Sequence, residues 1–195
     1  MESSQNPDWE TEFNRFEQAI SSSPAPIRVK SVIRLSALAN QSPESILSRA
    51  IPILAGLLRV SSDDPDRSVQ AAAAHCLKRI ACRGGEFAAR MGRCGAIASL
   101  LGLLLEAATN DNGISLRTIW VKCLWSLVTF GSSIRIGLAR LGGVEIVTRE
   151  LNTCEDDDDD SSNRRYLLEI LTALATIPES RRVPVLELFL SCVTT

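Results

Sequence analysis

His75 is the one histidine of the chain, and it stands beside a cysteine, so this pair is the first candidate for nucleophilic catalysis. A Cys-His or Ser-His-Asp arrangement needs the base within hydrogen-bond reach of the nucleophile. Four alanines at residues 71–74 precede the pair and predict a helix. Consecutive helical residues point about 100° apart, so Cys76 cannot be the partner of His75. We therefore expect no enzyme activity and interpret His75 as a structural or binding residue.

The other groups that could hold a metal or a cofactor lack the necessary spacing. Residues 155–160 are six consecutive acids, whereas a calcium loop alternates its ligands and carries a glycine. An unbroken run of like charge repels itself, so it predicts a solvated loop. Residues 83–86 lack the Gly-Lys-Ser/Thr ending of a phosphate-binding loop. No two cysteines have the spacing of a zinc site, so we expect no metal, no cofactor, and small buried thiols in a reducing compartment. The cysteines are Cys76, Cys82, Cys94, Cys123, Cys154 and Cys192.

The composition describes an ordinary soluble domain or array of 195 residues, with 45% apolar and 23% charged residues. The net charge is −2; without the six-acid run the chain holds 21 basic and 17 acidic residues, a mildly basic body with one acidic loop. Neither balance is typical of a nucleic-acid binder. No apolar stretch reaches the ~18 residues of a membrane helix, and the acidic start does not resemble a targeting peptide. We expect a cytoplasmic or nuclear protein with no membrane partner, and we keep an enzyme or a nucleic-acid binder as the disfavoured alternative function.

Two different apolar blocks recur along the chain, and this repeat is the main evidence for the fold. The first block occupies residues 50–58, 95–104 and 142–151, and its equivalent positions are 46 and 47 residues apart. The second block recurs four times, at separations of 42, 47 and 47 residues. The equivalent residues are Ile51, Ile97 and Val144 in the first block and Leu35, Leu77, Leu124 and Leu171 in the second.

Both blocks have the apolar spacing of helices. Trp120, Leu124 and Leu127 are four and three residues apart, which makes one helical stripe. Glycines at Gly95 and Gly142 precede two copies of the first block and predict sharp bends. The repeating unit is then a short helix, a bend, an apolar helix, a polar loop and a long helix. Because one unit cannot bury its own apolar faces, we predict an all-α solenoid of about four stacked units.

The two ends of the chain differ from this unit. Residues 1–26 are predicted to form a tail and a capping helix, because aromatic and apolar side chains are spaced four, three and four residues apart after Asp8. We assign them to core packing. Residues 27–195 form the array, with the acidic loop at 155–160. The apolar residues 183–193 resemble a middle helix without its final helix, which indicates self-association through this end or a shortened form of a longer protein. The N-terminal side chains are Trp9, Phe13, Phe16 and Ile20.

These blocks resemble the armadillo repeat over residues 27–192. The sequence GAIASLLGLL at residues 95–104 fits the middle helix of that family, and residues 68–77 and 123–128 fit its last helix. The resemblance implies a right-handed superhelix whose last helices line a concave groove for another polypeptide. It is specific for the fold and not for the function.

The residues with which the nuclear-import receptors of the armadillo family bind peptides are absent from this chain. Those receptors carry a Trp and, four residues later, an Asn on each last helix. Alanine cannot donate a hydrogen bond to a peptide, and arginine prefers carboxylate or phosphate. We therefore do not expect an import receptor. The Trp positions are occupied by Ile33, His75, Lys122 and Glu169, and the Asn positions by Ala37, Arg79, Ser126 and Ala173.

The chain is also similar to plant armadillo proteins, many of which carry a U-box for ubiquitin transfer ahead of the array. Only 26 residues precede the first repeat here, so ligase activity is not implied. An adaptor that recruits substrates for ubiquitin ligation stays open as an alternative to a plain scaffold.

We expect non-catalytic protein–protein interaction through the concave face. The groove positions His75, Arg79 and Lys122 are basic, which predicts an acidic partner segment, and the acidic loop is a candidate competitor within the chain. Trp125 aligns with polar residues and is the candidate apolar anchor, whereas Trp120 is assigned to the core. The candidate contact residues are His75, Arg79, Lys122, Trp125, Ser126, Arg165 and Glu169.

Overall fold

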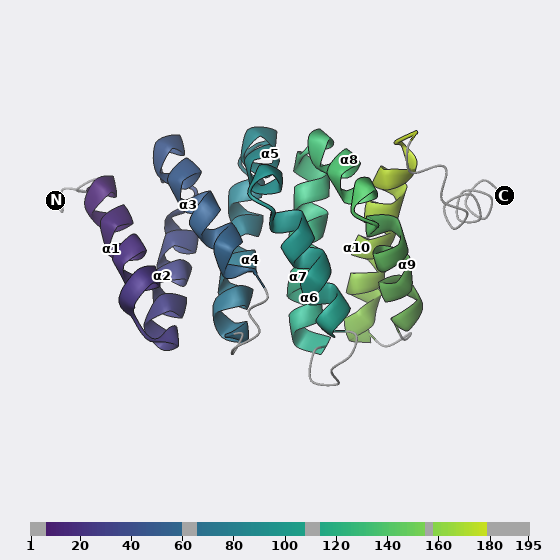
Figure 1. Ribbon diagram of the computed structural model, residues 1–195, viewed down its shortest axis with the longest axis horizontal. Helices are drawn as coiled ribbons and strands as arrows, with labels where there is room; N and C mark the ends of the chain where they lie inside the picture. Colours follow the sequence, from purple (N-terminus) through teal and green to yellow (C-terminus); the bar gives the residue numbers. More distant parts are fainter. Residues whose placement is uncertain (1–6, 60–65, 108–113, 155–157, 179–195) are drawn as a thin grey trace.

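The computed structural model describes residues 7–59, 66–107, 114–154 and 158–178. Within these ranges the chain forms ten α-helices and no strand, so the predicted all-α fold is confirmed (Figure 1). The helices are α1 (Trp9–Ser22), α2 (Ala25–Leu38), α3 (Glu44–Leu57), α4 (Arg67–Ala81), α5 (Gly85–Arg93), α6 (Ala96–Ala107), α7 (Ile114–Phe130), α8 (Ser132–Arg140), α9 (Gly143–Thr153) and α10 (Asp158–Ala175).

The helices pack in rows that run along the long axis of the molecule (Figure 1). The longest row contains α2, α4, α7 and α10, each packed on the next. A second row contains α1, α3, α6 and α9, and the short helices α5 and α8 contact each other in a third. The last two units therefore have three helices each, as the repeat predicted, and the first two are made of α1 with α2 and α3 with α4.

One hydrophobic core passes through all the units. The equivalent leucines of the second block are buried: Leu77 and Leu124 are fully enclosed and Leu171 is 2% exposed. Trp120 is 1% exposed, which confirms its assignment to the core. These side chains belong to a single cluster that extends from Phe13 in α1 to the residues that follow α10. Each unit therefore buries its apolar faces against its neighbours.

Helix α1 covers the first unit. Asp8 caps its N-terminus by accepting a hydrogen bond from the backbone N–H of Thr11 at 3.5 Å. Phe13 and Phe16 are buried as predicted, and the guanidinium of Arg49 lies 4.1 Å from the centre of the Phe13 ring. Because α1 packs on both α2 and α3, it takes the place of a middle helix, a role that its sequence did not indicate.

The predicted glycine bends are present. Gly95 and Gly142 have φ of 85° and 74°, in the left-handed region that favours glycine. Gly95 lies between α5 and α6, whose axes are bent by 71°. A residue with a Cβ would be strained at either bend, so the angle between the short helix and the middle helix depends on these glycines.

The acidic run is only partly the open loop that we predicted. Helix α10 begins at Asp158, so residues 158–160 form its first turn, and residues 155–157 lie outside the described residues. Acidic residues are favoured at the N-terminus of a helix by the helix dipole, which explains why half of the run is helical. Residues 183–193 also lie outside the described residues, so self-association through the C-terminal end stays a prediction.

A buried ion pair joins α7 to α9 and was not predicted. The side chain of Glu150 is fully buried, and its Oε2 lies 3.3 Å from Nε of Arg117, which is 13% exposed. Burial raises the pKa of Glu150, against the opposing effects of Arg117 and Arg149. Glu150 occupies the position that Leu103 takes in the preceding unit, so a charge here needs Arg117 as its partner.

Among the described residues, no single helix is long and apolar enough to cross a membrane. The bent pair of α5 and α6 meets that test by length and composition, but Leu100, Leu103 and Leu104 of α6 are fully buried inside the protein. No group of three metal-ligating side chains occurs in the same described ranges.

The burial of the cysteines predicts which thiols react. Burial raises the pKa of Cys76 and of Cys123 to about 12, so both are protonated at neutral pH, whereas Cys82 is exposed. Only the thiolate is nucleophilic. We expect iodoacetamide at pH 8 to alkylate Cys82 rapidly and to leave Cys76 and Cys123 unmodified, as measured by peptide mass spectrometry. The same reaction in denaturant is the control, and rapid alkylation of Cys123 in the native protein would contradict the structure.

Candidate functional site

In the long-helix row, α2 and α4 each expose a stripe of side chains, and Lys122 lies at the equivalent place on α7; we call this surface the ladder face. On α2 and α4 the stripe consists of four positions spaced four, three and four residues apart, all of them exposed or partly exposed. The two stripes are equivalent in the repeat, being 42 residues apart. They are Pro26, Lys30, Ile33 and Ala37 on α2, and Ser68, Ala72, His75 and Arg79 on α4.

The α4 stripe carries the basic groups predicted there. His75 is exposed, and its Nδ1 lies 3.4 Å from Oγ of Ser36 on α2. Partial burial lowers the pKa of His75, and the positive charges of Lys78 and Arg79 lower it further. Lys78, which also acts electrostatically on Cys123 of α7, was not among the predicted site residues. Lys78 aligns in the repeat with Trp125, which was a candidate contact, so this alignment could have identified Lys78.

Lys122 continues the basic surface onto α7. It is partly exposed, and its Nζ lies 5.8 Å from the centre of the Tyr166 ring on α10. The structure therefore places His75, Arg79 and Lys122 on neighbouring helices of one face. No carboxylate among the described residues forms an ion pair with Arg79 or Lys122.

Trp125 is not a free anchor, because it belongs to a cluster that joins α7 to α10. Its indole Nε1 donates a hydrogen bond to Oε2 of Glu169 at 2.6 Å, and its ring lies 5.0 Å from that of Tyr166. Arg165 donates to the other oxygen of Glu169 at 3.0 Å. These two hydrogen bonds lower the pKa of Glu169. We call Trp125, Tyr166, Arg165 and Glu169 the α7–α10 cluster; its members are bound to one another.

Ser126 is fully buried, although the sequence placed it among the candidate contacts. Its hydroxyl donates to the backbone oxygen of Lys122 at 3.0 Å, within the same helix. In its present position Ser126 cannot touch a partner. Helix α7 packs against both α4 and α10, and the spacing of a single helix does not reveal such neighbours.

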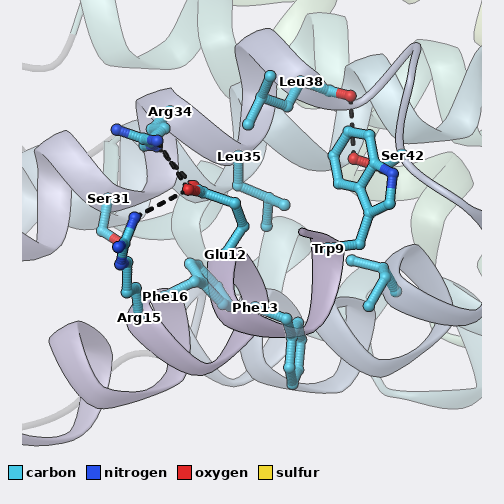
Figure 2. Close-up of a pocket in the computed structure, with 11 residues that line it drawn as sticks. Trp9, Glu12, Phe13, Arg15, Phe16, Ser31, Arg34, Leu35, Leu38 and Ser42 are labelled. Carbon is cyan, nitrogen blue, oxygen red and sulfur yellow. Dashed lines mark hydrogen bonds and ion pairs between the residues drawn. The ribbon is translucent and has the colours of Figure 1, made fainter. Parts of the chain in front are cut away.

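Two cavities lie away from the basic part of the ladder face. The first, about 90 Å³, lies where α1 faces α2 and is shown in Figure 2. Its wall holds Trp9, Phe13 and Phe16, and the carboxylate of Glu12 is bound there by Arg34, at 2.7 Å, and by Arg15. The second, about 250 Å³, lies between α3 and the N-terminus of α5. Neither includes a predicted site residue.

Solved structures of similar shape were found by comparison. Two engineered proteins of the Northeast Structural Genomics Consortium match with a TM-score of 0.64 each. They are 19% and 18% identical, over 83% and 88% of this chain and 63% and 69% of those chains. The designed armadillo repeat protein YIII(Dq)4CqI matches with a TM-score of 0.65 at 16% identity, over 84% of this chain and 64% of that chain. The fold is an armadillo-like helical solenoid.

At such low identity the likeness shows the fold alone, and the chain spans about two thirds of the length of these three proteins. No family model matches the chain, and no curated protein matches it in sequence. The armadillo-like architecture that the resemblance implied is confirmed by the solved structures. The function has to be argued from the ladder face itself.

His75 offers a direct probe of this face, because it is the one histidine of the chain and gives a single imidazole signal in NMR. We expect its pKa to lie below the ordinary value of 6.5 and to rise towards that value when Arg79→Gln or Lys78→Gln removes a neighbouring positive charge. The measurement is a pH titration of the Cε1–H resonance. Arg140→Gln, which removes an exposed charge on α8, is the control. A pKa above 6.5 in the native protein would contradict the described surroundings of His75.

Proposed function

We propose that this protein is a non-catalytic scaffold whose ladder face binds an acidic segment of a partner protein. The observation that carries the proposal is the basic surface on α4 and α7, where Arg79 and Lys122 have no carboxylate partner among the described residues. An armadillo-like solenoid presents such a surface along consecutive helices, which suits an extended polypeptide.

Three arginines elsewhere on the described residues are already paired with carboxylates. Arg34 and Arg49 are each held by a glutamate of α1, at 2.7 Å and 2.8 Å, and Arg67 pairs with a glutamate of α6. Those charges are already neutralised within the chain. Unpaired charges on one face attract an oppositely charged partner over a distance and select against basic ones.

The predicted site residues divide accordingly. His75, Arg79 and Lys122 are retained as contacts, and Lys78 is added because its charge acts on both His75 and Cys123 of α7. Ser126 is removed because it is buried. Trp125, Arg165 and Glu169 are bound to one another and form the border of the proposed site. Competition by the acidic run, recruitment of substrates for ubiquitin ligation, and a cytoplasmic or nuclear location stay hypotheses that no contact among the described residues favours.

The experiment is a selection of random displayed peptides on the purified full chain. We expect the selected peptides to be rich in Asp and Glu. Replacing both Arg79 and Lys122 by glutamate should weaken a selected peptide by about tenfold or more at low salt, because two attractions become repulsions. Affinity is measured by fluorescence anisotropy at two salt concentrations, since screening weakens exposed charge interactions.

The matched control replaces Arg59 and Arg140 by glutamate. Both are exposed, and neither lies on the long-helix row. Two basic residues become glutamates in each variant, so the change in net charge is the same. The proposal predicts that the control binds like the native chain. Equal losses in the two variants, or selected peptides without an excess of acidic residues, would contradict it.

A further inference from the structure

Beside Lys30, the ladder face of α2 carries exposed apolar side chains at the positions where α4 carries His75 and Arg79. Ile33 is 56% exposed, and Ala37, one turn further on, is exposed as well. In the repeat, Ile33 occupies the position that His75 takes on α4 and Lys122 on α7. The α2 stripe therefore has an apolar side chain at the repeat position where α4 and α7 have basic side chains. Covering such a side chain with apolar surface is favourable.

The other end of the basic surface is closed by the α7–α10 cluster. Both carboxylate oxygens of Glu169 accept hydrogen bonds, one from Trp125 and one from Arg165. Trp125 and Tyr166 pack their rings together between the two helices. An acidic partner segment meets the negative charge of Glu169 there, at a carboxylate whose two oxygens are already bound. The available surface thus runs from α2 to α7.

The spacing of the helices sets the spacing of a matching ligand. Packed helices lie about 8–10 Å apart, and α2, α4 and α7 are packed in succession. A polyproline II segment rises about 3.1 Å per residue with three residues per turn, so every third side chain points to the same side, about 9 Å further along. One side chain in every three can therefore contact successive helices of the row.

We propose that the partner segment has one apolar side chain that packs on Ile33 and two acidic side chains, about three and about six residues away, that face Arg79 and Lys122. This inference rests on the proposed function. It adds an apolar anchor on Ile33, the order of the side chains along the ligand, and the limit of the binding surface at the α7–α10 cluster. Charge complementarity identifies the acidic part of the ligand, and the exposed isoleucine at the equivalent position identifies the apolar part.

The test uses the full chain and fluorescein-labelled synthetic peptides read by anisotropy. One peptide carries leucine and two glutamates at the proposed spacing, with serine and proline between them, and is made in both chain directions. A second has alanine in place of leucine. We expect the leucine peptide, in one direction, to bind about fivefold to tenfold more tightly than its alanine counterpart.

Two variants of α2 make the test specific. Ile33→Ser should remove the advantage of the leucine peptide and leave the alanine peptide unchanged. Ile27→Ser is the matched control, because Ile27 is 49% exposed on the same helix but lies off the stripe, and it should change neither affinity. Both side chains are exposed, so folding is expected to survive, and circular dichroism checks it.

Each other outcome overturns a defined part of the account. If the leucine and alanine peptides bind equally, or Ile33→Ser and Ile27→Ser act alike, the apolar anchor is wrong. If Arg79→Glu weakens both peptides while Ile33→Ser has no effect, the proposed function stands and this inference fails. If neither peptide binds, the inference fails, and the peptide selection alone decides the proposed function. Displacement of the peptide by a single-stranded oligonucleotide of equal charge would show a general polyanion site and overturn the inference too.

Discussion

The burial of leucines between consecutive long helices is the interaction on which the rest of the structure depends. Leu77 of α4 and Leu124 of α7 are fully enclosed, and Leu171 of α10 is nearly so. Leu124 lies 47 residues after Leu77, and Leu171 lies 47 residues after Leu124. No unit can bury its apolar surface alone, so the position of each helix is fixed by the unit before it and the unit after it. The straight succession of α2, α4, α7 and α10 is a consequence of this burial.

The ladder face follows from the same constraint. In a helix the residues that point to the core and those that point away alternate with a 3.6-residue period, so a fixed core stripe leaves a fixed outer stripe. Leu77 is buried, while His75 and Arg79 lie on the outer side of the same helix. The outer residues are free to vary in chemistry from one unit to the next. Here the position of Ile33 on α2 is taken by His75 on α4 and by Lys122 on α7, and the α7–α10 cluster follows.

The features that depend on periodicity could be predicted from the sequence. The repeat indicated the stacking, and the glycines between its helices indicated the bends. The helical class and the burial of Trp120 follow from spacing along a single helix. The contacts between units could not be predicted in this way. The hydrogen bond from Trp125 to Glu169 joins residues 44 positions apart, and it makes the candidate anchor part of the border of the proposed site. The buried pair of Arg117 and Glu150 and the place of α1 in the middle-helix row depend likewise on neighbours that a local pattern does not contain.

The most direct test of the shared core is native-state hydrogen exchange on a Leu124→Ala variant. Removing a fully buried leucine is expected to cost about 2–5 kcal/mol. If the units share one core, amide protection must fall in α4 and α10 as well as in α7, because both pack on α7. Faster exchange confined to α7, with α4 and α10 protected as in the native chain, would contradict the account.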